Sequence, residues 1–502
     1  MESLLIEISK HYTHQTISAE HSLSLLLDSF DWRLYNKGYL LRHSNQHSEL
    51  LNMDGHLLHK ATIPQKKRPR FIHDFPKGKL KDSLTSILAP RALLERAQIV
   101  VESCVYTVLD QEKKTVVRLQ HEQIFLQSKK PLPPLQDQLI CTPLRGYEKE
   151  FTTITRILTE DCGLTAATKS ENIMKLSLEK MNRRVKDYSS KADLNLDENF
   201  SGLDAAKYIL GSTFETITRN EQGIIDDLDI EFLHDFRVAV RRSRSLLSLL
   251  KGIFHDTITD ELKTDLKKMG SLTGALRDHD VYLDKKDEYK KMVPAALRPG
   301  LDKYFEDIHK QRIDEQKKLT QFLQSKEYQQ ISRKWQQYMR APQLADMDKG
   351  NNADISIKKL ASKSISKRYK KIIATGQMFD HQTEDSEIHQ MRIEFKKLRY
   401  LLEFFKSLFS KNEMNHFIQQ LKTVQNCLGN FNDLSVQQES LMQHIQAMPC
   451  NRKEHLMVAA SLGGLIAHMS EEQQKLRTVF FEDFEIFANQ ENQNLFDTLI
   501  QF

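Results

Sequence analysis

The sequence predicts an α+β region followed by an all-α region within one chain of 502 residues. Residues 1–165 contain stretches of alternating apolar and polar side chains between turn-forming residues, which is typical of antiparallel strands. From about residue 200 onward the pattern becomes helical, with few prolines and many Leu, Lys, Gln and Glu residues. A basic motif occurs twice in this second region, 155 residues apart, which indicates an internal duplication.

The strand prediction depends on three segments, residues 4–8, 98–102 and 115–119. Turn-forming residues separate them at positions 54–55, 76–78 and 110–114. Segments of this length joined by tight turns favour an antiparallel sheet.

In the helical region, a helix is expected before each copy of the basic motif, over residues 203–223 and 355–379. The Lys-, Ser-, Asp- and Asn-rich segment 181–199 is predicted to be a linker, and residues 342–352 a loop between the repeats. The apolar run 458–469 is too short to span a bilayer and is predicted to be a closely packed core helix.

The duplicated motif places a cation three, seven, eight and ten positions after a histidine. The residues are His234, Arg237, Arg241, Arg242 and Arg244 in the first copy, and His389, Arg392, Lys396, Lys397 and Arg399 in the second. The same offset relates Gly274 to Gly429 and Asp278 to Asp433, so the register continues beyond the motif.

On a helix, the histidine and the cations at +3, +7 and +10 fall within an arc of about 80°, beside an apolar stripe. Arg242 and Lys397 lie away from this arc. Like charges four residues apart disfavour a helix, so an anion or carboxylates must face the arc. Arginine binds phosphate oxygens through two parallel bonds, and one-turn spacing suits a chain of phosphates.

Two interpretations that require no bound ligand stay open. Carboxylates of a neighbouring helix would neutralise the cations without any ligand, although the duplication argues against this. Each histidine either binds phosphate and becomes protonated there or stays neutral and fixes the packing of the helix start.

The helix over 355–379 carries a further cationic run, which is either a solvated face or an extension of the same surface. The run consists of Lys358, Lys359, Lys363, Lys367, Arg368, Lys370 and Lys371.

The composition predicts a soluble, cytoplasmic protein of about three domains. The formal net charge is only +5, so clustering of cations is more informative than their total. Five cysteines form no CxxC pair and no metal-ligand spacing, and are predicted to be reduced thiols. No signal peptide or membrane-spanning segment is expected.

The doubled HxxR motif, followed in each copy by a glycine-aspartate segment (272–278 and 428–433), closely resembles the conserved histidine α-helical domain, CHAD. The resemblance covers residues 200–490, with repeats over about 200–340 and 353–490. It implies two pseudo-symmetric four-helix bundles whose basic helices line a cationic groove. It also implies association with inorganic polyphosphate, which agrees with the arginine and lysine spacing.

Residues 1–180 are similar to a CYTH domain, the triphosphate tunnel fold, through residues 28–42 and 143–150. This resemblance implies an antiparallel β-barrel or tunnel-like domain whose ExExK strand holds Mg²⁺ or Mn²⁺ against a triphosphate. The corresponding strand here keeps Glu7, but Ser9 and His11 replace the second Glu and the Lys. Arg42 persists, and Ser44 replaces the second basic residue. Glu122 and Glu150 are the other candidate carboxylates.

The leading hypothesis is therefore a non-catalytic polyphosphate-binding protein, with no catalytic or metal-ligating residues and with polyphosphate granules as a candidate location. The first alternative is a CYTH-type triphosphatase or polyphosphatase that requires Mg²⁺ or Mn²⁺. The second is nucleic-acid binding, which is disfavoured because the motifs lack aromatic stacking platforms. The segment 278–280 (Asp-His-Asp) suggests a metal site, but its repeat mate is Asp-Leu-Ser, which favours a packing role.

Overall fold

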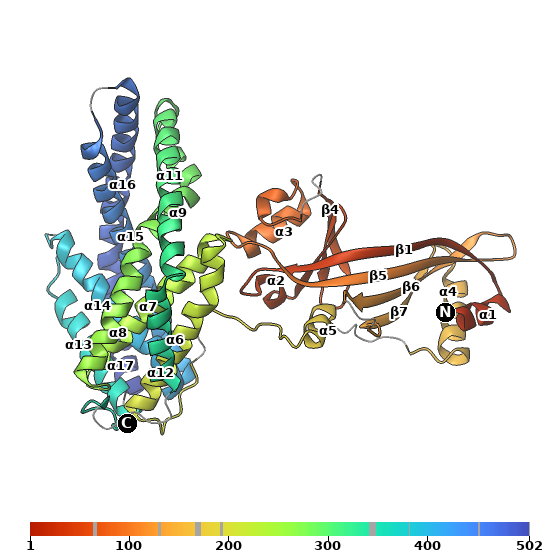
Figure 1. Cartoon of the computed structure of the whole chain (residues 1–502), viewed down its shortest axis with the longest axis horizontal. Helices are drawn as coiled ribbons and strands as arrows, with labels where there is room; N and C mark the ends of the chain where they lie inside the picture. Colours follow the sequence, from red (N-terminus) through yellow and green to blue (C-terminus); the bar gives the residue numbers. More distant parts are fainter. Residues whose placement is uncertain are drawn as a thin grey trace. The chain divides into compact units, whose positions relative to one another are not determined.

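The computed structural model describes residues 1–63, 68–128, 132–165, 172–190, 194–340, 348–380, 382–449 and 452–500. The chain divides into two compact units, Met1–Ser190 and Lys191–Phe502 (Figure 1). The division falls within the predicted linker, part of which (191–193) lies outside the described residues, as does most of the predicted loop 342–352. The domain limits at 180, 200 and 490 stay predictions.

The first unit contains an antiparallel sheet in the order β4-β3-β2-β1-β5-β6-β7. The strands are β1 (Thr13–Asp28), β2 (Tyr39–Ser44), β3 (His47–Asn52), β4 (Leu57–Thr62), β5 (Leu94–Leu109), β6 (Thr115–Leu126) and β7 (Gln136–Pro143). Residues 98–102 and 115–119 lie in β5 and β6, which confirms those two strand predictions. The α+β character predicted for this region is also confirmed.

The sheet is open, so the prediction of a closed barrel is wrong. Within the described residues, the edge strands β4 and β7 pair with no second partner. The register gives the reason. The three short strands β2, β3 and β4 extend the sheet beside one half of β1, where Ser24–Leu27 pair with β2. On the opposite side of the sheet, β7 pairs with β6 residues that lie level with the other half of β1. The two edges are therefore offset along the strand direction.

The prediction of a strand over residues 4–8 is also wrong, because these residues lie in helix α1 (Glu2–Ser9). Leu4 and Ile8, one helical turn apart, pack against a core cluster that includes Val108 and Val116. A short apolar run fits either period, and here packing on the sheet selected the helix.

Short helices complete the first unit: α2 (Arg33–Asn36), α3 (Lys79–Leu88), α4 (Glu148–Arg156) and α5 (Ile173–Lys180), with helical turns at Ile72–Asp74 and Ile157–Asp161. Helix α3 contributes Leu80, Leu84 and Leu88 to one apolar cluster of the sheet, and α5 contributes Ile173, Met174 and Leu178 to another.

The second unit is all-helical, as predicted (Figure 1). Its first half contains α6 (Gly202–Ile225), α7 (Ile230–Leu249), α8 (Asp256–Leu272), α9 (Gly274–Asp284), α10 (Lys286–Lys291), α11 (Arg298–Leu323) and α12 (Lys326–Arg340), with a 3₁₀ turn at Ala295–Leu297. Its second half contains α13 (Ile357–Gly376), α14 (Asp385–Phe405), α15 (Lys411–Ala447), α16 (Lys453–Phe487) and α17 (Gln490–Ile500), with a 3₁₀ turn at Lys406–Leu408.

The duplication is visible where α6 and α13 begin. The Gly202 amide donates to the Ile355 carbonyl at 2.8 Å, and the Ile357 amide donates to the Phe200 carbonyl at 2.9 Å. Donors and acceptors in this pair of bonds are each 155 positions apart, so the two bonds are related by a local twofold. The halves differ elsewhere. Thr273 separates α8 from α9, whereas the corresponding α15 is one continuous helix.

The apolar run 458–469 lies in α16, where Val458, Leu462, Leu465 and Met469 are buried, as expected of a core helix. They share a core cluster with Leu301 and other residues of α11. None of the helices described is long and apolar enough to cross a membrane.

Candidate functional site

Helices α7 and α14 each bury an apolar face and leave the cationic arc on another face. In α7, Phe236, Val240 and Leu247 are almost fully buried. Their mates at the 155-residue offset in α14 are buried in the same way, and so is Leu398; these mates are Met391, Phe395 and Leu402. The cations therefore lie outside both cores, as the helical period predicts.

The two motif helices meet each other through polar contacts. Arg241 of α7 donates from Nε to the hydroxyl of Tyr400 on α14 at 2.5 Å. Glu403 of α14 accepts from Arg242 Nη2 at 2.9 Å and from Arg399 Nε at 2.6 Å. One carboxylate thus links a cation of each copy.

Arg237 and Arg392 occupy equivalent positions and are held by the helices that follow their own motif helix. Arg237 Nη1 donates to Thr273 Oγ1 at 2.9 Å and to the Gly270 carbonyl at 3.3 Å. Arg392 Nη2 lies 3.4 Å from Asp433 Oδ1. Both guanidinium groups are half-buried and fixed in direction.

We call Arg237, Arg241, Arg392, Lys396 and Arg399 the basic cluster. Burial and then the charges of Arg392 and Arg241 lower the pKa of Lys396 to about 8. Burial also lowers the pKa of Arg237 and of Arg392, against the opposing charges of Asp278 and Asp433, while Arg241 lowers both further. Cations of the two copies are therefore close enough to repel one another.

The remaining motif residues differ in their surroundings. His389 has Nδ1 at 2.9 Å from Asn432 Oδ1 and Nε2 at 3.3 Å from Ser435 Oγ, so both ring nitrogens have partners within the protein. His234 is half-buried and also interacts within the chain. Arg244 is exposed. Lys397 pairs with Glu394 at 3.1 Å, away from the cluster.

The sequence motif did not identify Tyr400 and Glu403, which join the two helices. Their mates at the 155-residue offset are Ser245 and Ser248, so the joining residues occur only in the second copy. A comparison of the copies would have marked these positions as different, but not as contacts.

Glu403 is the carboxylate that neutralises part of the cationic surface. We expect Glu403→Gln to lower the free energy of unfolding by about 1 kcal/mol, because two partly exposed guanidinium groups lose their counter-charge. The same variant should bind polyanions more tightly, because the cluster becomes more positive. Denaturant titration and a binding titration at one salt concentration measure the two effects. A loss of both stability and affinity would contradict this role.

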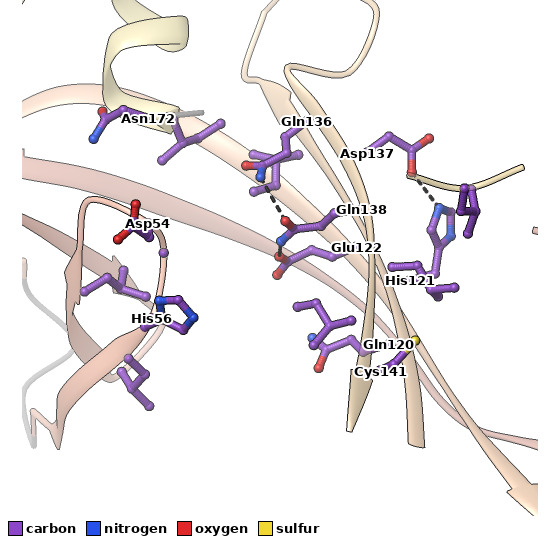
Figure 2. Close-up of a pocket in the computed structure, with 18 of the residues that line it drawn as sticks. Asp54, His56, Gln120, His121, Glu122, Gln136, Asp137, Gln138, Cys141 and Asn172 are labelled. Atoms are coloured by element: carbon purple, nitrogen blue, oxygen red, sulfur yellow. Dashed lines mark hydrogen bonds and ion pairs between the residues drawn. The ribbon is translucent and has the colours of Figure 1, made fainter. Parts of the chain in front are cut away.

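The first unit contains a separate cavity of about 990 Å³ on its sheet. Arg42 and Glu122 are among the residues that line it, and Glu122 is labelled in Figure 2. Arg42 donates to Glu49 from Nη2 at 2.8 Å and lies 4.0 Å from Glu122. Gln138 donates to the other Glu122 oxygen at 2.7 Å, as Figure 2 shows. The guanidinium of Arg42 and the carboxylates of Glu49 and Glu122 therefore all have partners within the protein.

The carboxylate expected on the predicted ExExK strand lies elsewhere. Glu7 belongs to α1, pairs with Lys10 at 2.6 Å and does not line the cavity, and neither does Glu150. Among the described residues, no group of three or more His, Cys, Asp or Glu side chains has the arrangement of a metal site. Asp280 instead accepts from Arg312 at 2.9 Å, in line with a packing role. Within the described residues, the cavity lining therefore contains no such group of side chains to hold the metal of a metal-bound triphosphate.

Part of the helical unit matches a known protein family. Residues 208–442 match the model of the CHAD domain. This segment is a CHAD domain. It contains both motif helices and the whole basic cluster, and so the resemblance seen in the sequence is confirmed for it. No curated protein matches the chain.

Two solved structures are similar to the chain. The crystal structure of the CHAD domain from the plant Ricinus communis has 27% identity and a TM-score of 0.48, over 57% of this chain and 94% of that one. PptA from Streptomyces chartreusis has 13% identity and a TM-score of 0.44, over 57% of this chain and 100% of that one. The CYTH resemblance of residues 1–180 stays a prediction.

Proposed function

We propose that this protein binds inorganic polyphosphate through the basic cluster of its CHAD domain and does not hydrolyse it. The observation that carries the proposal is the meeting of α7 and α14, which brings Arg241 close to Arg392 and Lys396. Cations from both copies then belong to one surface, and CHAD domains are associated with polyphosphate.

The electrostatics support a polyanion as the ligand. Half-buried cations that repel each other destabilise the folded protein unless an anion neutralises them. Arginines spaced by one helical turn, about 5.4 Å, present several sites to a chain of phosphates. Among the described residues, the carboxylates near the cluster are Asp278, Asp433 and Glu403, which are fewer than its five cations.

We further infer that the two halves of the helical unit are pseudo-symmetric four-helix bundles, and that residues 1–180 are a divergent CYTH domain. The reciprocal bonds at the starts of α6 and α13 support the first inference. The cavity on the antiparallel sheet supports the second. A protein of this kind is expected in the cytoplasm, at polyphosphate granules.

The decisive test is a polyphosphate titration with and without Mg²⁺ or Mn²⁺, followed for phosphate release. We expect binding without metal, no release, and a steep loss of affinity with salt, because bound cations displace condensed counterions. Affinity that does not change with salt would contradict the electrostatic site. Metal-dependent release that disappears in Glu122→Gln would support the hydrolase alternative. RNA that competes fully for the site would support nucleic-acid binding.

A further inference from the structure

Helix α13 carries an exposed row of lysines that the basic cluster does not include. Lys359, Lys363, Lys367 and Lys370 are all exposed, and their spacing places them within an arc of about 80° on the helix. We call these four residues the lysine stripe. Two of its neighbouring pairs are four residues apart, a spacing at which like charges disfavour the helix.

The other cations of α13 have counter-charges. Lys358 pairs with Glu198, while Arg368 and Lys371 both pair with Glu394 of α14, which also accepts from Lys397. In the part of the chain that the structure describes, no carboxylate pairs with any residue of the lysine stripe. The charge of the stripe therefore faces solvent without compensation from the fold.

The first repeat provides an internal comparison. Helices α6 and α13 begin at equivalent positions, so the offset of 155 gives the mates of the stripe directly. The mates are Asp204, Tyr208, Ser212 and Glu215. The same helix face is acidic or neutral in α6, so the fold does not require cations there.

The lysine stripe and the basic cluster lie on different helices and face different directions, because the stripe is about 100–180° around α13 from Arg368, which contacts α14. Arg368 and Lys371 of α13 contact α14 at Glu394. On α14, Glu394 and the cluster residue Arg392 are separated by about 160° around the helix axis. The two cationic sites are therefore separate, and an anion must be longer than the cluster to contact both.

We propose that the lysine stripe is a second contact for the polyphosphate chain that the basic cluster holds, so that long chains bind at both places. This inference depends on the proposed function of the cluster. The second contact is intramolecular once the first has formed, so it raises affinity only for chains long enough to span both. The protein thereby selects long polymers.

The test compares chains of about ten phosphates with chains of about several hundred, in wild type and in a variant with Lys→Gln at all four stripe positions. We expect the variant to bind short chains as wild type does and to bind long chains about tenfold more weakly. Lys→Arg at the same four positions should restore long-chain binding. Lys303, Lys310, Lys317 and Lys318 of α11 provide the matched control, because each is exposed but already pairs with an acidic residue.

The outcomes separate the two proposals. If wild type binds no short chains and no long chains, the proposed function of the cluster fails. If wild type binds both lengths but the stripe variant still binds long chains fully, only the present inference fails. An equal loss in the α11 control variant would also overturn it, since general surface charge would then explain the effect. Loss of binding to anionic vesicles or RNA, with polyphosphate binding unchanged, would assign the stripe to another partner and overturn it too.

Discussion

Replacing Arg237 and Arg392 together by Gln is expected to weaken polyphosphate binding by about 100-fold or more. A hydrogen bond to a charged group contributes about 1.5–3 kcal/mol, and the double variant removes one such donor from each copy. Both guanidinium groups are half-buried and held in place by Thr273 and Asp433, so little ordering is needed on binding. Calorimetric or fluorescence titration at one fixed salt concentration measures the change.

The matched control is Lys303→Gln with Lys310→Gln on α11, which removes the same charge from exposed positions. Its effect on affinity should be less than about threefold, because distant surface charges are largely screened. Equal losses in the two double variants would remove the site assignment. Thermal unfolding of both variants verifies that the comparison is made between folded proteins.

Lys396 is expected to make binding depend on pH in the alkaline range. Burial and the neighbouring arginines lower its pKa to about 8, so the free protein loses this charge as the pH rises through 8. A bound phosphate chain favours the charged form and raises the pKa again, so protonation and binding are linked. Affinity should therefore be level below pH 7 and fall by about tenfold between pH 7 and pH 9. Titrations across this range measure the profile.

Lys396→Arg is the control for this linkage, because arginine stays protonated up to pH 12 and should keep its affinity at pH 9. A fall of the same size in Lys396→Arg would show that another group titrates. Protonation of Lys396 has the opposite effect on folding stability: it favours binding but destabilises the folded protein. Because the folded pKa is lowered, the charged lysine destabilises the fold below pH 8, and this cost disappears as the pH rises from 8 toward 10.5. Lys396→Met should thus raise the unfolding temperature at pH 7 while it weakens binding.

Periodicity predicted the helical unit well. Residues 203–223 and 355–379 correspond to α6 and α13 within a few residues, and the apolar stripe of each motif helix is buried. The N-terminal unit was harder to predict. Residues 4–8 form a helix where the sequence predicts a strand, because five residues cannot distinguish a period of two from one of 3.6 and packing against Val108 selects the helix.

For the charged residues, too, part of the arrangement follows from the sequence and part only from the structure. The helical period predicts that Arg242 and Lys397 lie away from the cationic arc, and in the structure both form ion pairs with glutamates. The alternative in which carboxylates of a neighbouring helix neutralise the arc holds in part, since Asp433 of α15 lies beside Arg392 of α14. The pair of Glu403 with Arg399 lies within α14 itself. The spacing of charges within one helix cannot show which carboxylates another helix brings opposite.

By itself, the sequence determined that this protein contains a duplicated basic helix with its cations on one arc, because residue spacing fixes the angle of a side chain around its own helix axis. Only the tertiary structure decided that Arg241 reaches Tyr400 and lies near Lys396, that Glu403 joins the two copies, and that the N-terminal sheet stays open. These features depend on how elements far apart in the chain pack together, and no local pattern specifies the packing of one element against another.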